Sequence, residues 1–390
     1  MKLRHRIANR MSIALVVIIL ASSILMAFAV TRSGTELLTR AATVQLAHES
    51  KVVSVRLQAI LGAAQHDVVF MANSPAVQNV VNALEASRKN PERINSAKNH
   101  LQDMFAAFLS NHPWYAQIRL ISADERGMEV VRVDQANDQI IRIPAAELQE
   151  KGRRDYIQET LNESPGKVYW SPIDLNREHG KIVEPLQPVL RVGMPIDGRY
   201  GGQFGIVMIN LDVERVFETA REVVTADTTL YIANNEGDYL YHINPEKTFG
   251  FEQGERHLIQ DDFTKDALKP TGTSTLILHD VTPSGSEESV IAHISRLKIK
   301  EYGKNNLLIT LTRPRGPILD EVKNARYEAA VLILPIVLVA IALIVWMIRM
   351  FTYPLERVTQ EVSHFTPGKQ PCLLEQNRRD EIGLLAQAFT

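Results

Sequence analysis

The sequence predicts an α+β fold in which a long N-terminal helix carries two tandem antiparallel-sheet modules between two transmembrane helices. Three observations lead to this prediction. Uncharged apolar runs lie toward both ends of the chain. Apolar residues recur every three to four positions after the first run and every second position in several later segments. The expected segments are a cytoplasmic basic arm (1–10), a first transmembrane helix (11–31), long helices with a membrane-distal module (32–225), a membrane-proximal module (226–328), a second transmembrane helix (329–349) and a partial linker (350–390).

The composition limits the class of protein. The chain has 390 residues, 45% of them hydrophobic, which is enough for two or three domains with separate cores. Its formal net charge of -2 gives no electrostatic reason to expect nucleic acid as a partner. The single cysteine, Cys372, cannot form an internal disulfide, so we expect the outer region to be held together by packing alone.

Two apolar runs are long enough to cross a membrane. Ile13–Val30 and Ala329–Ile348 contain no charged residue, and a helix needs about 20 residues to cross about 30 Å of hydrocarbon. The first run is longer than the core of a cleaved signal peptide, although Ala27-Phe28-Ala29 leaves cleavage as the alternative. Basic residues outside the two runs place both termini in the cytoplasm and residues 31–328 on the other side: Lys2, Arg4, Arg6, Arg10, Arg349 and Arg357.

Helical periodicity follows the first run. Apolar residues at steps of three and four predict one helix that continues to about Leu84: Leu37, Leu38, Ala41, Val44, Val52, Val55, Ile60, Leu61, Ala64 and Val68. This stripe fits either a dimer interface or packing against a second helix of the same chain. Asn90-Pro91-Glu92, a capping residue followed by proline, predicts the start of that second helix.

A period of two begins at Trp114 and predicts two sheet modules. In the first module we expect strands or hairpins at Tyr115–Ser122, Met128–Asp134, Lys167–Ser171, Pro188–Pro195 and Phe204–Leu211, with helices at Asp155–Leu161 and Val213–Glu222. The order repeats more loosely in the second, with strands at Thr229–Ala233, Tyr239–His242, Ser274–Leu278, Val290–Ser295 and Asn306–Leu311. Arg315-Gly316-Pro317 then begins a helix that runs into the second apolar run.

Several phrases of the first module occur in an order that resembles a known family. They are Ile118-Arg119-Leu120, Gly127–Asp134, Asp155–Thr160, Val168–Asn176 and Glu178-His179-Gly180. Together they resemble the double-Cache (double PAS-like) extracytoplasmic sensors of histidine kinases and cyclic-dinucleotide enzymes, over about residues 35–325. The resemblance implies two PAS-like modules, a ligand site in the membrane-distal one, and a place in the bacterial inner membrane with the sensor in the periplasm.

The C-terminal residues resemble a HAMP linker. Tyr353–Val358 is similar to its start and Asp380–Phe389 to the start of its second helix. The residues that this resemblance assigns to signal relay are Pro354, Asp380, Glu381 and Gly383. The chain stops within that second helix, so we expect a truncated product that has lost its output domain.

Polar residues on and beside the first predicted sheet are the candidates for ligand binding. Arginine suits a carboxylate because its planar fork can hold two oxygens, and an aspartate such as Asp174 suits an ammonium group covered by aromatic faces. The candidates are Arg119, Arg132, Asp134, Tyr156, Tyr169, Trp170, Ser171, Asp174 and Arg191. In the competing interpretation, Arg132, Asp134 and Arg191 form structural ion pairs or point outward.

The sequence therefore predicts a two-pass receptor that senses a small extracytoplasmic ligand, such as an amino acid or organic acid. We expect a homodimer that relays the signal through the second transmembrane helix, most simply to a histidine kinase. The alternatives are the sensor half of a diguanylate cyclase or phosphodiesterase, and a module that reads a periplasmic binding protein. The sequence has no catalytic, metal or cofactor motif, and Glu178-His179 fits a solvated loop better than a metal site.

Overall fold

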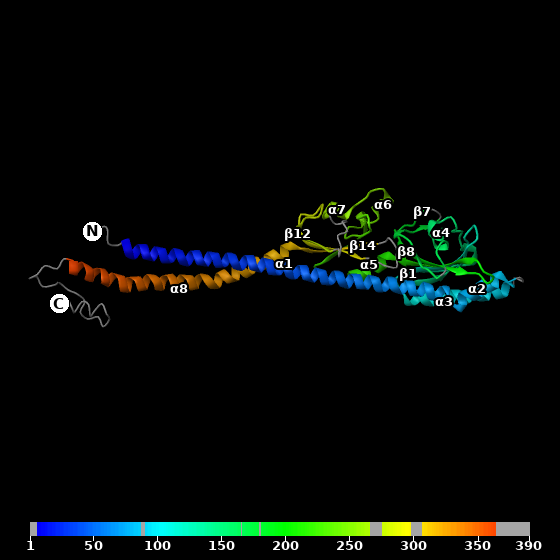
Figure 1. The fold of residues 1–390 in the computed structure, drawn as a ribbon, viewed down its shortest axis with the longest axis horizontal. Coiled ribbons are helices and arrows are strands. Elements are labelled where there is room, and N and C mark those ends of the chain that lie inside the picture. The colour runs from blue at the N-terminus through cyan, green and yellow to red at the C-terminus, as the bar shows by residue number, and fades with distance from the viewer. Residues whose placement is uncertain are drawn as a thin grey trace, which may run out of the picture. The chain divides into compact units, whose positions relative to one another are not determined.

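The structure is a computed structural model that describes residues 6–86, 90–164, 166–178, 181–265, 275–297 and 306–363 (Figure 1). The predicted relay residues Asp380, Glu381 and Gly383 lie outside this part of the chain. The chain divides into two compact units, one made of residues 39–316 and the other of residues 1–38 and 317–390.

Two helices supply the second of these units. α1 (Arg6–Ala72) begins in it, and α8 (Arg315–Ser363) ends the described chain. Each contains a stretch that is long and apolar enough to cross a membrane, and no other part of the described chain buries either stretch. α8 continues through Pro335 and Pro354 as one helix. Both helices therefore fit the predicted membrane spans.

The prediction of one helix up to Leu84 was wrong. α1 ends at Ala72, and a separate helix, α2 (Pro75–Glu85), follows it. Ser74 caps α2 by accepting a hydrogen bond from the backbone N–H of Val77, and Pro75 occupies the first helical position. Because proline lacks a backbone N–H and favours this position, the Ser-Pro pair starts a new helix although the apolar period continues.

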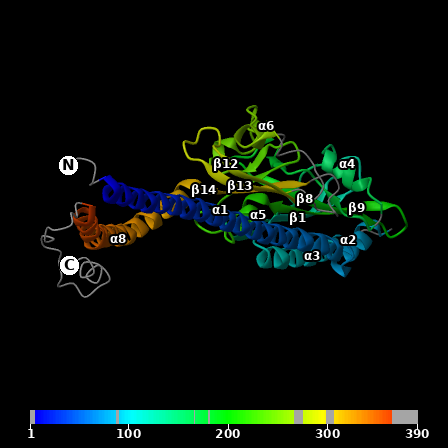
Figure 2. The ribbon, with the colours of Figure 1, turned by 60° about the vertical axis from the view of Figure 1, so that its left-hand side comes forward.

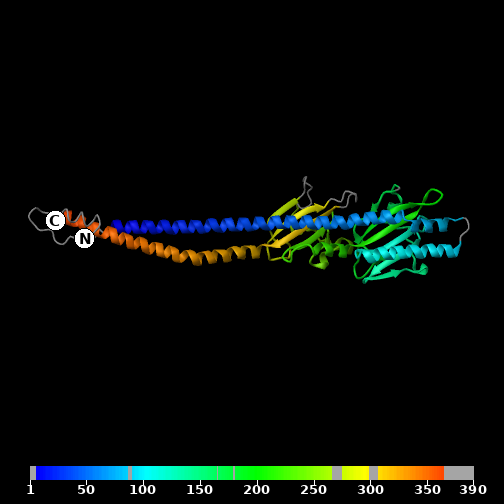
Figure 3. The same ribbon diagram turned by 90° about the horizontal axis from the view of Figure 1, so that it is seen from below.

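The predicted apolar stripe of α1 divides between two faces. Ile60, Leu61 and their periodic neighbours are fully buried by the rest of the chain, whereas Val44 and Val55 are 65% and 51% exposed. The second predicted helix, α3 (Pro91–Asn111), is capped by Asn90 as expected and lies beside α1 (Figure 3). Packing within the chain therefore accounts for one part of the stripe and leaves the other uncovered.

The first sheet module, which we call the distal module, is built on an antiparallel sheet with the strand order β3-β2-β1-β9-β8-β4, and β5 pairs with β8. Its strands are β1 (Tyr115–Ser122), β2 (Glu129–Ala136), β3 (Gln139–Arg142), β4 (Tyr169–Trp170), β5 (Asp174–Leu175), β8 (Pro188–Asp197) and β9 (Gln203–Asp212). A separate hairpin pairs β6 (Arg177–Glu178) with β7 (Lys181–Ile182). The short strands β3 and β5 to β7 were not predicted.

Helices cover the two faces of this sheet. α1 and α3 lie on one face, and α4 (Asp155–Leu161) lies on the other (Figure 2). Ile121 packs against Ile157 of α4, so Gln117 and Arg119, which alternate with the residues of the opposite face, also point toward α4. Polar side chains of β1 are thereby directed to the α4 side, where the candidate site lies.

The second sheet module, which we call the proximal module, has an antiparallel sheet with the order β11-β10-β14-β13-β12. α5 (Val213–Arg221) leads into it from the distal module, and α6 (Gly250–Gln253) and α7 (Ile259–Asp262) lie in the long connection after β11. The strands are β10 (Thr229–Ala233), β11 (Tyr239–Tyr241), β12 (Thr275–Val281), β13 (Val290–Leu297) and β14 (Leu307–Pro314). The predicted α+β fold with a long N-terminal helix and two sheets is confirmed.

Candidate ligand-binding site

A cavity of about 340 Å³ opens in the distal module between α4 and the edge of the sheet. Three arginines, three carboxylates and two tyrosines dominate its described lining, so positive and negative side chains balance. The lining residues are Arg154, Asp155, Tyr156, Glu159, Tyr169, Ser171, Pro172, Asp174, Leu175, Arg177 and Arg191.

An ion pair between β8 and β5 forms one wall of the cavity. Arg191 donates from Nη1 to Oδ1 of Asp174 at 2.5 Å, and Ser171 Oγ accepts from the Arg191 backbone N–H at 3.0 Å. Burial raises the pKa of Asp174, and the positive charge of Arg191 only partly offsets this. The Arg191 side chain is 5% exposed whereas that of Asp174 is 41% exposed, so the carboxylate is the accessible member of the pair.

Tyr156 of α4 is held between two guanidinium groups. The Arg191 Cζ lies 4.6 Å from its ring centroid and the Arg119 Cζ lies 5.8 Å away. Burial by itself raises the pKa of Tyr156, but the charges of Arg119 and Arg191 outweigh it and leave the pKa below the ordinary value. The ring thus forms an aromatic partition between the cavity and the buried Arg119.

Tyr169 and Glu159 form a second pair at the cavity. The Tyr169 hydroxyl donates to Oε2 of Glu159 at 2.5 Å. Burial and this hydrogen bond to a carboxylate both raise the pKa of Tyr169, so it remains a neutral donor. Glu159 lies on the predicted short helix but was not among the predicted site residues. A polar residue on the exposed face of a helix is ordinary, so nothing in the sequence distinguishes it as part of a site.

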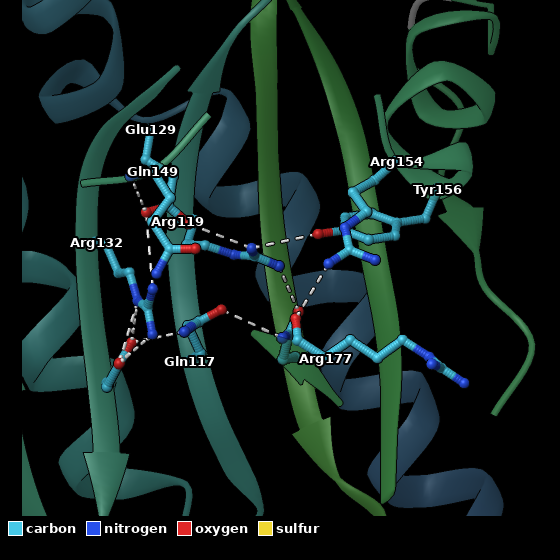
Figure 4. Close-up of polar contacts among 10 residues, drawn as sticks. Gln117, Arg119, Glu129, Arg132, Gln149, Arg154, Tyr156 and Arg177 are labelled. Atoms are coloured by element: carbon cyan, nitrogen blue, oxygen red, sulfur yellow. Dashed lines mark hydrogen bonds and ion pairs between the residues drawn. The ribbon is translucent and has the colours of Figure 1, made fainter. Parts of the chain in front are cut away.

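A buried polar network lies behind Tyr156 and contains the other candidate charges (Figure 4). Arg119 donates to Asn210 at 3.0 Å and approaches Glu129 at 3.4 Å, and both Arg119 and Glu129 are almost fully buried. Arg132 and Asp134 form a bidentate pair with N–O distances of 2.7 to 3.1 Å. These three candidates, Arg119, Arg132 and Asp134, are paired within the sheet and do not line the cavity, although the buried Nε of Arg119 has no hydrogen-bond partner among the described residues.

Trp170 lines a different, apolar cavity of about 30 Å³. This cavity adjoins Leu57 and Leu61 of α1, and Ser171 lines both cavities. The structure therefore brings together five of the nine predicted residues, namely Tyr156, Tyr169, Ser171, Asp174 and Arg191.

Two cavity arginines lie where no sequence pattern indicated them. Arg154 immediately precedes α4, and its Nη2 donates to the backbone carbonyl of Arg177 at 3.4 Å. Arg177 belongs to the β6–β7 hairpin. The cavity can therefore offer guanidinium donors from three separate elements and carboxylate acceptors from α4 and β5, which is a set suited to binding charged groups.

Comparisons with known proteins agree with this fold. Residues 86–265 match the family model of the bacterial histidine kinase sensor domain. No curated protein matches the chain in sequence. The structure resembles the extracellular domain assigned to the histidine kinase vpHK1S-Z8, with a TM-score of 0.58 and 17% identity over 74% of this chain and 96% of that chain.

Two further solved structures share the fold. One is a domain assigned to a sensory box/GGDEF family protein from Vibrio parahaemolyticus, with a TM-score of 0.57 and 17% identity over 73% of this chain and 99% of that chain. The other is the extracellular domain assigned to the histidine kinase soHK1S-Z6, with a TM-score of 0.50 and 14% identity over 73% of this chain and 98% of that chain. These findings confirm the predicted extracytoplasmic sensor region.

Proposed function

We propose that this membrane receptor, whose residues 86–265 are a sensor domain of the bacterial histidine kinase type, binds a small zwitterionic ligand in the distal cavity. The observation that carries the proposal is the balanced charge of the cavity lining, with three arginines facing three carboxylates. A volume of about 340 Å³ lies at the lower end of the usual range for small-molecule sites, about 300 to 1,000 Å³.

The two ends of a zwitterion have suitable partners in this cavity. Arg154 and Arg177 can hold a carboxylate through their planar guanidinium groups, while Asp174 offers a partly exposed acceptor for an ammonium group. Tyr156 and Tyr169 line the same cavity and add aromatic surface to it. A dianion would leave the carboxylates of the lining facing like charge, so a ligand of zero net charge fits best.

A thermal-shift screen of the full chain in detergent micelles tests this proposal. Single L-amino acids and, separately, short dicarboxylates are added at about 1 mM, a concentration at which weakly bound ligands still stabilise a protein. We expect stabilisation by at least one amino acid, and loss of it in Asp174→Asn and Arg191→Lys. Asp103→Asn and Arg142→Lys serve as matched controls, because that pair, at 2.8 Å, is exposed on the same module.

The possible outcomes separate the rival functions. Stabilisation by dicarboxylates alone would replace the zwitterion with an organic acid. If no compound stabilises the chain, or if the cavity variants respond as the parent does, the small-ligand proposal is wrong. In that case a receptor that reads a periplasmic binding protein becomes the better interpretation.

We also propose the orientation in the membrane, with both termini in the cytoplasm and residues 31–328 outside. Support comes from the basic residues that flank the two apolar stretches. In a Cys372→Ser background, Tyr200→Cys should react with a membrane-impermeant maleimide in intact spheroplasts, since Tyr200 is 69% exposed. Labelling of this position only after lysis would reverse the proposed orientation.

We also propose how the signal leaves the sensor region. α8 follows β14 directly, so a change in the proximal sheet can reach the second membrane helix and the HAMP-like residues beyond it. A histidine kinase is the output that best agrees with the family of residues 86–265. We further propose a homodimer that pairs the uncovered face of α1 around Val44 and Val55.

A further inference from the structure

One carboxylate of the proximal module reaches into the distal module. Glu252 lies on α6, and its Oε1 accepts the backbone N–H of Leu175 at 2.7 Å. Its Oε2 accepts from Nη2 of Arg177 at 2.9 Å. The Glu252 side chain is 12% exposed and Leu175 is fully buried, so their hydrogen bond is shielded from water, whereas the Arg177 side chain is 39% exposed and its ion pair is only partly shielded.

Both partners of Glu252 belong to the wall of the ligand cavity. Leu175 and Arg177 line it, and Leu175 directly follows Asp174, which is paired with Arg191. The backbone carbonyl of Arg177 accepts from Arg154, another lining residue. Glu252 therefore fixes one backbone amide and one guanidinium of the cavity without lining the cavity itself.

The charge of Glu252 also acts on the carboxyl group of Asp174, which lines the cavity. It adds to the effect of burial in raising the pKa of Asp174, while Arg191 and Arg177 act in the opposite direction. The electrostatic influence and the two hydrogen bonds point to the same conclusion, that the state of the cavity and the position of α6 depend on each other.

We propose that Glu252 is a positioning residue of the distal cavity and the link through which that cavity acts on the proximal module. This inference rests on the proposed function, because the cavity is taken as the ligand site. A ligand that orders Arg177 strengthens its bond to Glu252, and by thermodynamic reciprocity a fixed Glu252 favours binding. Coupling passes through identified contacts between the modules, in addition to the shared helix α1.

Hydrogen–deuterium exchange of the full chain in nanodiscs, without any ligand, tests the link. Glu252→Ala removes both interactions, and Glu252→Gln retains an acceptor for Leu175 while removing the charge. We expect exchange in residues 172–178 to rise roughly three- to tenfold in Glu252→Ala and less in Glu252→Gln. Glu255→Ala is the matched control, since its carboxylate on the same connection is 85% exposed.

A second comparison tests the direction from the cavity to α6. Asp174→Asn should change exchange in residues 249–254 of the parent chain and should have no such effect in the Glu252→Ala background. Equal exchange in Glu252→Ala and Glu255→Ala would overturn the positioning role. An effect of Asp174→Asn that persists without Glu252 would overturn the link. Because no ligand is present, either failure leaves the ligand proposal to be judged by the thermal-shift screen.

Discussion

The two sheet modules are similar in architecture but treat their charged residues differently. In the distal module Asp174 has a 41% exposed side chain beside an open cavity. In the proximal module Asp262 has a 6% exposed side chain and accepts hydrogen bonds from Tyr239 at 2.8 Å and Lys247 at 3.2 Å. The carboxylate of Asp174 is thus accessible from solution, whereas that of Asp262 is enclosed by partners from the same chain.

The difference shows how one fold can leave a charged cavity open in one module and close the corresponding polar network in the other. Aromatic residues surround Asp262, with Tyr231 near Tyr239, His242 and Phe263 at ring-centroid distances of 4.9 to 6.1 Å. A closed network of this kind stabilises a unique packing only if every member is satisfied. The distal module instead confines its buried polar network to the region behind Tyr156 and keeps the cavity in front of it.

The largest effect on stability is expected in the buried polar network of the distal module. Arg119→Met would remove a guanidinium that is 2% exposed and leave Glu129, which is 1% exposed, with less compensation. Breaking a buried pair in this way costs about 3 to 5 kcal/mol of unfolding free energy. Chemical denaturation of the full chain in detergent measures it. A loss below about 1 kcal/mol would mean that this network is as accessible to water as the cavity.

A pH effect of intermediate size is expected in the proximal module. Burial and the charge of Lys247 lower the pKa of His242 to about 4, and its Nδ1 accepts from the backbone N–H of Asn244 at 2.8 Å. Between this value and the ordinary value of about 6.5, the unfolded chain binds more protons, so acidification destabilises the fold.

The size of this effect follows from the two pKa values. Going from pH 7 to pH 5 should cost about 2 kcal/mol through His242 alone. The measurement is the difference in unfolding free energy between the two pH values, compared between the parent and His242→Gln. An identical pH dependence in both proteins would show that His242 is open to protonation in the folded state.

The same substitution in both modules gives a direct comparison with a smaller effect. Tyr239→Phe removes the hydrogen bond to the buried Asp262 and should cost about 1 to 2 kcal/mol. Tyr169→Phe removes the hydrogen bond to Glu159, which can turn to water in the cavity, and should cost less than about 0.5 kcal/mol. Thermal unfolding of the two variants decides this, and equal losses would contradict the distinction between open and closed modules.

The smallest effect on stability is expected on the uncovered face of α1. Val55→Glu places a charge at a position that is 51% exposed, so the unfolding free energy should change by less than about 0.5 kcal/mol. Under the dimer proposal, the same variant should shift the full chain from dimer to monomer in light scattering. Leu57→Glu, at a fully buried position of the same helix, should instead destabilise the fold.

The elements with a regular pattern of apolar residues could be predicted from the sequence. α4 begins and ends at the predicted residues, and β1 matches its predicted range, because apolar periodicity reports burial directly. The two-residue strand β5 could not be predicted, since it exists only by pairing with β8, where Asp174 lies opposite Val189. The break before α2 was present as Ser74-Pro75, but the continuing apolar period concealed it.

Predictability of the site follows the same physical rule. Arg191 stood out as a charge among apolar strand residues and Asp174 as a carboxylate close in sequence to Tyr169 and Trp170, and both line the cavity. Arg132 and Asp134 stood out equally, but residues two apart on a strand share a face and here pair with each other. Arg154 lies on a connection and Arg177 on the short β6–β7 hairpin, and the position of such segments depends on contacts distant in sequence, such as that of Arg177 with Glu252.

The direct junction of β14 with α8 has a consequence for building chimeric receptors. Pro314 ends the strand and Arg315 begins the helix, so no residue lies between the two elements. Each residue added there would turn everything downstream by about 100° around the helix axis, whereas seven residues restore nearly the same phase. The activity of fusions to another protein's output domain should therefore vary periodically with the number of inserted residues. A steady change with that number would indicate a flexible junction.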